Sequence, residues 1–306
     1  MSYEGLGPGV VSQQGLRERL LVLRSCDLFD GFDDPALLLL AEHAKTGSYR
    51  AGQTISEAPD AARAVFVVTA GSVTLRRNAR DVTFAAGSAF GAMALLARQP
   101  LGLARADRDT RTLEIPAAAL EAAIDESFSA LRSTLRIAGA AVLKARGYLP
   151  VDPLSERKVE EGTFHEQPRS FVERLIELRS GPFRYMNVEA LVDLARHMRE
   201  VRVAKGQVIW AVGDASTYAF HIDYGRVRCT SSDGRHVAVG RGFTIGVLDV
   251  WASEGRAYEA LAETDLIGFH VDFEDFLTLL ETHVEVGIDI LRSLAQSVLE
   301  EPAPGR

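Results

Sequence analysis

The sequence contains few cysteines: Cys26 and Cys229 are the only two in 306 residues. Two cysteines cannot form a disulfide framework or a zinc cluster. No apolar run approaches the roughly 20 residues that a membrane-spanning helix needs. The N-terminal residues also lack a basic segment followed by an apolar one, the pattern that marks a secretory signal. We therefore expect a cytoplasmic protein that makes no membrane contact.

Positive charge is also in deficit. The chain has 34 Lys and Arg against 42 Asp and Glu, which gives a formal net charge of −8. A general nucleic-acid binder is expected to carry a basic surplus or a dense basic face. The residues after Phe276 are too few for a terminal helix and a separate DNA-binding module of about 60 residues. We expect no DNA-binding domain and no direct contact with nucleic acid.

Sequence signatures of catalysis are missing as well. There is no nucleophile elbow and no phosphate loop ending in Gly-Lys-Ser/Thr. A His-x-His pair, with which cupins bind a metal ion, does not occur either. We expect a protein that is not an enzyme, with no catalytic residues and no metal site. A cupin-like metal-dependent enzyme remains an alternative, which metal bound to the purified protein would support.

What the sequence does contain is an internal repeat. Residues 41–75 align with residues 195–229 at a constant offset and without gaps. The matched pairs include Gly52 with Gly206, Ile55 with Ile209, Asp60 with Asp214, Phe66 with Phe220, Gly71 with Gly225 and Val73 with Val227. Chance similarity does not hold register over such a length. We predict an N-terminal tail (1–15), a first domain (16–147), a linker (148–170), a second domain (171–300) and a C-terminal tail (301–306).

Each repeat has the same order of segments. A helical segment opens it, and short strand-like runs punctuated by glycine follow, such as 64–69, 73–76 and 82–84 in the first repeat. Each repeat ends in an amphipathic run, 115–147 or 272–300, whose apolar seam is typical of one long helix. Many short strands with glycine turns predict a closed β-roll. The expected fold is mainly β with flanking α: two tandem β-roll (jelly-roll) domains, each followed by a long helix.

This order, with the repeated pattern of Gly, Ile, Asp, Phe, Gly and Val given above, resembles the cyclic-nucleotide-binding domain family over nearly the whole chain. Catabolite activator proteins and protein kinase A regulatory subunits contain such domains. The resemblance implies an eight-stranded β-roll that binds cAMP or cGMP through a phosphate-binding cassette. In that cassette, a glycine precedes a short helix whose N–H groups face the cyclic phosphate. A glutamate accepts the ribose hydroxyl, an arginine about ten residues later pairs with the phosphate, and a Ser or Thr adds a hydrogen bond.

The first repeat keeps the cassette glycine and lacks both charged residues. It has Gly91, Ala92 in place of the glutamate, and Pro100 or Leu101 in place of the arginine. A buried monoanion without a cationic partner is costly. Arg98 and Arg105 are alternative cations, but long cationic side chains usually remain hydrated, so we expect both to face solvent. We predict a degenerate cassette in the first domain.

The second repeat keeps the arginine, Arg256. The glutamate position holds Val247, so the ribose contact is missing unless Asp249 substitutes. Glu259 occupies the hydroxyl position, where its charge would repel a phosphate. Arg256 is then either a retained anion ligand or, as electrostatics favours, one partner of an internal pair with Asp249 or Glu259 that fills the pocket. The candidate ligand-binding residues of the second domain are Gly246, Val247, Asp249, Arg256, Ala257 and Tyr258.

These observations predict a regulatory or sensor protein for signal transduction in which cAMP and cGMP binding has diverged or been lost. A ligand or a partner would reposition the long helices. Candidate ligands are a cyclic nucleotide or another small nucleotide-like molecule, and a partner protein or a second copy would associate through those helices. Aromatic residues of the second repeat either pack in its core or line a pocket for a different flat ligand: Trp210, Tyr218, Trp251 and Tyr258. A purely structural interaction module with inactive pockets remains an alternative.

Overall fold

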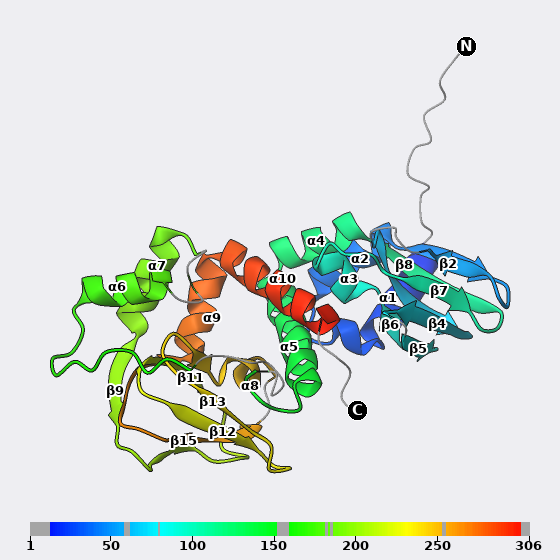
Figure 1. The fold of residues 1–306 in the computed structure, drawn as a ribbon. Coiled ribbons are helices and arrows are strands. Elements are labelled where there is room, and N and C mark those ends of the chain that lie inside the picture. The colour runs from blue at the N-terminus through cyan, green and yellow to red at the C-terminus, as the bar shows by residue number, and fades with distance from the viewer. Residues whose placement is uncertain are drawn as a thin grey trace. The chain divides into compact units, whose positions relative to one another are not determined.

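The computed structural model describes residues 13–57, 62–78, 80–151, 159–180, 183, 186–252 and 255–300. Contacts divide the chain into two compact units, and the division falls between Thr134 and Leu135. In each unit the helices gather on one side of the strands (Figure 1). Asp60 of the repeated pattern, most of the predicted N-terminal tail and the whole C-terminal tail lie outside the described residues. The predicted domain limits remain a prediction.

Unit 1 is a pair of antiparallel sheets with helices before, between and after the strands. Its strands are β1 (Lys45–Tyr49), β2 (Thr54–Ser56), β3 (Ala64–Ala70), β4 (Ser72–Arg77), β5 (Arg80–Ala85), β6 (Ala89–Phe90), β7 (Leu103–Ala106) and β8 (Thr110–Pro116). Its helical elements are α1 (Gln13–Arg24), the 3-10 turn η1 (Asp27–Phe29), α2 (Asp34–His43), α3 (Ala92–Leu96), α4 (Ala117–Glu126) and α5 (Phe128–Ala145), which crosses into unit 2. The sheet orders are β1-β8-β3-β6 and β2-β7-β4-β5.

Unit 2 repeats this plan. Its strands are β9 (Arg199–Val203), β10 (Val208–Trp210), β11 (Tyr218–Tyr224), β12 (Val227–Ser231), β13 (His236–Val239), β14 (Thr244–Ile245), β15 (Tyr258–Ala262) and β16 (Leu266–Asp272). Its helices, besides the end of α5, are α6 (Phe171–Ser180), α7 (Val188–His197), α8 (Val247–Ala252), α9 (Phe273–Thr282) and α10 (Val284–Glu300). The sheet orders are β9-β16-β11-β14 and β10-β15-β12-β13, which are those of unit 1 strand for strand.

Local details recur between the units as well. The register of β3 against β8 shifts between Val68 and Ala70, and that of β11 against β16 shifts at the matching place, between Ile222 and Tyr224. A bulge of this kind bends the strand and increases its twist, so two units that share bulges share the curvature of their sheets. The predicted fold of two tandem β-rolls with flanking helices is confirmed.

The core of unit 2 lies between its two sheets. It consists of Leu149, Val151, Trp210, Phe220, Ile222, Val227, Cys229, Val239, Ile245, Tyr258, Ala260, Ala262 and Leu266. Both cysteines of the chain are free and buried. Leu149 and Val151, at the start of the predicted linker, thus pack in this core.

The prediction of one long helix after each roll is wrong. Two helices stand in each place, because the chain leaves the helical conformation at Ser127 and at His283. Ser127 has extended backbone angles, and its hydroxyl accepts a hydrogen bond from the N–H of Ala130 in the first turn of α5. A serine in this position satisfies an N–H that the new helix leaves unpaired. At the second break the His283 ring contacts the Asp193 carboxylate on α7, at 3.2 Å.

Candidate functional site: the two cassettes

The cassette of unit 2 begins at a glycine with a left-handed backbone. Gly246 has φ of +82°, and a Cβ there would lie 2.4 Å from Nη1 of Arg256 and 3.2 Å from the Trp210 ring. A side chain would therefore meet both backbone strain and a clash. The helix α8 starts at the next residue, and the chain returns to the roll through Arg256 into β15. Glycine here allows the arginine to lie directly against the backbone.

The Arg256 side chain is fully buried. Its guanidinium lies against two aromatic rings, 4.0 Å from the centroid of Trp210 and 4.7 Å from that of Tyr218, in the corner that these rings form at 77° to each other. Nη2 donates to the carbonyl of Tyr218 at 2.6 Å, and Nη1 donates to the carbonyl of Gly246 at 3.4 Å. Aromatic faces attract a cation more strongly when water is excluded. The protein thus holds this guanidinium with its own groups.

The internal anion of this cassette is Asp249. Its carboxylate Oδ2 lies 3.8 Å from Nη1 of Arg256, and both side chains are fully buried. Oδ1 accepts the N–H of Ala257 at 3.4 Å. Burial raises the pKa of Asp249 to about 6, against the opposing effect of the Arg256 charge. Burial also lowers the pKa of Arg256, although Asp249 counters this. Of the two internal pairs considered from the sequence, the one between Arg256 and Asp249 is present.

Glu259 does not lie where the sequence placed it. Tyr258 and Ala260 are buried in the core of unit 2, and side chains alternate between the two faces of a strand. Glu259 therefore points away from the core, so it neither pairs with Arg256 nor repels a ligand inside the roll. The residue that points inward is Tyr258, whose hydroxyl accepts the N–H of Gly246 at 2.8 Å. Burial raises the pKa of Tyr258 far above its usual range, so the hydroxyl keeps its proton.

Five of the six candidate residues meet in one cluster: Gly246, Asp249, Arg256, Ala257 and Tyr258. The sixth, Val247, lines an apolar cavity on another side of α8. Sequence reasoning did not assign Trp210 and Tyr218 to the arginine. A usable signal was their asymmetry between the repeats, because Ser56 and Ala64 stand at the matching positions of the first repeat.

The cassette of unit 1 begins with the same backbone conformation as that of unit 2, but apolar side chains fill it. Gly91 has φ of +98° and precedes α3. Leu101, at the position that matches Arg256, is buried, and its Cδ1 lies 3.6 Å from where a Cβ of Gly91 would be. Ala94 stands where unit 2 has Asp249. A leucine and an alanine thus replace the arginine and the aspartate together.

The alternative cations of unit 1 lie outside its cassette. The side chains of Arg98 and Arg105 are both exposed. Pro100 is exposed too, and its carbonyl accepts a hydrogen bond from Nη1 of Arg77 at 2.5 Å. Ala92, in the glutamate position, is buried. Neither Arg98 nor Arg105 is therefore placed inside the roll.

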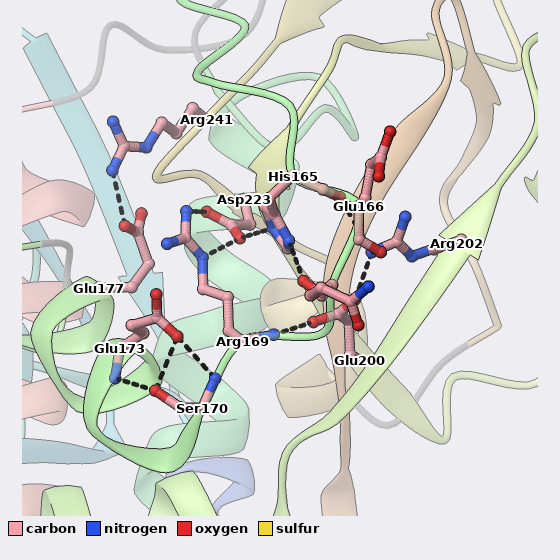
Figure 2. Close-up of polar contacts among 11 residues, drawn as sticks. His165, Glu166, Arg169, Ser170, Glu173, Glu177, Glu200, Arg202, Asp223 and Arg241 are labelled. Atoms are coloured by element: carbon pink, nitrogen blue, oxygen red, sulfur yellow. Dashed lines mark hydrogen bonds and ion pairs between the residues drawn. The ribbon is translucent and has the colours of Figure 1, made fainter.

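A second polar cluster of unit 2 surrounds Asp223 near the end of β11, and its carboxylate is fully buried. Figure 2 shows this carboxylate between the Arg169 guanidinium and the His165 ring. Arg169 donates from Nη2 to Oδ1 at 2.7 Å and from Nε to Oδ2, and His165 Nε2 lies 2.9 Å from Oδ2. Burial raises the pKa of Asp223, but the hydrogen bonds from Arg169 and His165 outweigh it and bring the pKa below the usual value.

This cluster fastens the 159–170 segment, which precedes α6, to the second roll. The backbone N–H groups of Arg241 and Gly225 donate to the carbonyls of Glu160 and Glu161, each at 2.7 Å. Arg202 on β9 donates to the carbonyl of His165 at 3.0 Å. The segment was predicted to be part of a linker; the structure pairs it with the edge of the roll.

His221, also on β11, is a buried histidine that does not act as a base near neutral pH. Burial lowers its pKa to about 4, against the opposing effects of Glu177 and Asp223. Its Nδ1 lies 2.9 Å from the hydroxyl of Thr244. Within the described residues, no three or more His, Cys, Asp or Glu side chains are grouped to hold a metal ion. Nor is any described helix long and apolar enough to span a membrane.

Two cavities are found in unit 2. One, of about 480 Å³, lies over β9, β10, β11 and β16, with Tyr218 and His270 in its wall. The other, of about 570 Å³, lies between α8 and α10. Arg256 and Asp249 line neither of them. The charged pair is therefore not presented to a ligand in either cavity.

Asp249 gives unit 2 a specific pH dependence. Its pKa in the folded protein is about 6, whereas an unfolded aspartate titrates near 3.9, roughly. Between these values the folded protein keeps a proton that the unfolded chain has released, so the contribution of Asp249 to the free energy of unfolding decreases as pH rises from about 4 to about 6. His221 acts in the opposite sense, because its pKa is lowered.

The test therefore compares the free energy of unfolding of two proteins. Urea denaturation of the wild type and of Asp249→Asn is compared across that pH range. We expect the free energy of unfolding of the wild type to decrease relative to the variant as pH rises. A constant difference would contradict a raised pKa for Asp249.

Comparisons with known proteins identify the class. A profile of the cyclic nucleotide-binding domain matches residues 46–127 and again residues 200–283. The two matches cover more than half of the chain. The chain belongs to the cyclic nucleotide-binding domain family and carries the domain in tandem. No curated protein matches it.

Comparison with solved structures gives matches over nearly the whole chain and matches over part of it. The chain is 15% identical to the regulatory domain of Toxoplasma gondii PKA with cAMP, covers 93% of its own length and 97% of that chain, and gives a TM-score of 0.36. It is also 15% identical to the regulatory subunit of a cAMP-independent protein kinase A from Trypanosoma brucei. That match covers 93% of this chain and 90% of the other, with a TM-score of 0.35. The N-terminal domain of a transcriptional regulator from Streptomyces coelicolor A3(2) is 28% identical. That match covers 39% of this chain and 88% of the other, with a TM-score of 0.35. TM-scores this low carry no argument, so the family assignment rests on the profile.

Proposed function

We propose that this chain is a regulatory or sensor protein without enzymatic activity, whose two domains have lost the ordinary binding of cAMP and cGMP. The observation that carries the proposal is the internal pairing of Arg256. Its guanidinium is fully buried, in contact with two aromatic rings and placed 3.8 Å from the Asp249 carboxylate. A cyclic phosphate would have to displace that carboxylate and would bring a second negative charge beside it.

The first domain supports the same proposal by a different route. Leu101 and Ala94 supply no charge, and Arg98 and Arg105 lie at the surface. A nucleotide phosphate in this roll would be buried without a cation, which is unfavourable. The degenerate positions proposed for this domain are those expected from the sequence: Gly91, Ala92, Pro100 and Leu101.

The signal in this proposal passes through the helix pairs that follow the rolls, α4 with α5 and α9 with α10. A ligand other than a cyclic nucleotide, or a protein partner, would change how these helices pack. Each pair has a break, at Ser127 and at His283, where rotation would disturb few helical hydrogen bonds. The domain limits of 16–147 and 171–300 belong to the proposal.

Titration with nucleotides tests the loss of binding. We expect no heat in calorimetry and no shift in melting temperature with cAMP or cGMP at about 1 mM, whereas a site with a dissociation constant of about 10 µM would add about 2.7 kcal/mol of stability there. Arg256→Leu is measured beside the wild type. Stabilisation of the wild type but not of the variant would contradict the proposal for the second domain. Equal stabilisation of both would place the nucleotide at a site without Arg256 and would contradict a general loss of binding.

A further inference from the structure

The short helix α8 has an apolar face that lies away from Arg256. Val247, Leu248 and Trp251 on this face form one wall of the cavity of about 570 Å³. The facing wall comes from α10, through Val286, Ile290 and Leu294 among others. The rest of the lining comes from the end of α5, from α7 and α9, from the strands β11, β14 and β16, and from neighbouring loops. The cavity thus separates the helix of the cassette from the last helix of the unit.

The aromatic side chains of this lining pack against one another. The Trp251 ring meets the Phe273 ring edge to face, with centroids 5.2 Å apart, and meets the Phe276 ring at 6.0 Å. Aromatic pairs in this geometry hold one another in fixed orientation. The cavity therefore has a rigid aromatic floor between α8 and α9.

The charged side chains around the cavity already have polar partners within the protein. Asn187 donates to Oε1 of Glu285 at 2.6 Å while its own oxygen caps α7. The Asp289 carboxylate lies 3.1 Å from Nη1 of Arg292. Arg146 donates to the carbonyl of Pro150 at 3.0 Å. A charged ligand would have to compete with these contacts for its partners. The cavity therefore favours an uncharged ligand.

The size of the cavity points to a small molecule. Ligand pockets measure roughly 300–1,000 Å³ and are lined mainly by apolar and aromatic side chains with a few polar groups. The cavity of about 570 Å³ falls in this range and is partly open to solvent, since Glu285, Asp289 and Ser293 of its lining are exposed. An apolar occupant would remove the apolar side chains of the wall from water and so stabilise the protein.

We propose that the cavity between α8 and α10 binds a neutral, largely apolar small molecule, whose rings lie against Trp251. Bound there, the ligand bridges the cassette helix and the last helix and holds α10 in place. This step rests on the proposed function, since it supplies a ligand other than a cyclic nucleotide. The recognition is by shape and apolar contact, with the hydroxyls of Ser293 and Ser297 at the α10 wall.

The probe for this site is 1-aminoanthracene, an uncharged three-ring amine that fluoresces in apolar surroundings. We expect saturable binding of one probe to the 306-residue chain. Ser297→Phe fills the cavity from α10, and Val247→Phe fills it from α8. Either change should weaken probe binding by about tenfold or more, because added volume competes with the ligand for the same space. The matched control, Gln296→Phe, lies on the exposed side of α10 and should bind as the wild type does.

The outcomes separate this inference from the proposed function. No saturable binding, or equal affinity in the wild type and both filled variants, overturns the cavity assignment. Circular dichroism of each variant without probe establishes that it is folded, and the two filled variants enter the cavity from different helices, so one folded variant suffices. The same samples are titrated with cAMP. A response to cAMP beside the expected probe results contradicts the lost nucleotide binding alone.

Discussion

Arg256→Leu lowers the free energy of unfolding of the protein by about 3–5 kcal/mol at pH 7, the usual cost of removing one partner of a buried ion pair. The change leaves the fully buried Asp249 carboxylate without its cation. It also removes the guanidinium that packs against the rings of Trp210 and Tyr218. Urea denaturation followed by circular dichroism measures the loss. The control is Arg228→Leu on β12, whose partly exposed side chain lies 3.9 Å from Glu263 and should contribute less than about 1 kcal/mol.

A second substitution distinguishes charge from packing. Asp249→Ala combined with Arg256→Leu gives unit 2 the pair that unit 1 has, Ala94 and Leu101. We expect the double variant to be more stable than Arg256→Leu alone, because no uncompensated charge remains buried. Lowering the pH should also reduce the penalty of the single variant, since the loss of the Arg256 charge removes an effect that lowers the pKa of Asp249, and the buried carboxylate then takes up a proton more readily than in the wild type. A double variant as unstable as the single one would assign the whole loss to packing.

The repeat was the part of the fold that the sequence could predict. Paired glycines such as Gly71 and Gly225, and paired apolar residues such as Phe66 and Phe220, fix the same turns and the same inward faces in both units. Two chains with the same turns and the same inward faces form the same sheets, and the strand orders agree. The helix breaks could not be predicted from periodicity, because the apolar seam continues through Ser127 and His283 while the backbone does not.

The sequence predicted which residues form the cassette better than it predicted where their side chains point. The position of Arg256 was predicted from the resemblance to the family's cassette, whereas its aromatic surroundings come from β10 and β11, which contribute Trp210 and Tyr218. The direction of Glu259 depends on the residue at which β15 enters the sheet, and a change of one residue reverses which side chains face the core. The Asp223 cluster joins residues far apart in the sequence, such as Arg169 and Asp223, so no local pattern revealed it.

Arg169→Met is expected to lower the free energy of unfolding of unit 2 by about 3 kcal/mol, since it leaves the buried Asp223 carboxylate without its main cation. Arg169 makes two hydrogen bonds to this carboxylate, and His165 is its remaining neighbour (Figure 2). The loss should be present at neutral pH and diminish in acid, because Asp223 has a pKa below the usual value in the folded wild type and keeps its charge until the pH is low. Urea denaturation at pH 7 and in acid measures it.

Hydrogen exchange shows whether Arg169→Met loosens the 159–170 segment alone or destabilises the whole of unit 2. Hydrogen exchange should increase in the 159–170 segment of Arg169→Met before it increases in β12, because the segment depends on Asp223 while β12 is paired on both sides. Arg202→Met is the matched control. Its side chain also donates to this segment but is 40% exposed, so it should cost less than about 1 kcal/mol. Equal losses in the two variants, or exchange that rises together in the segment and in β12, would mean that Asp223 does not anchor the segment through Arg169.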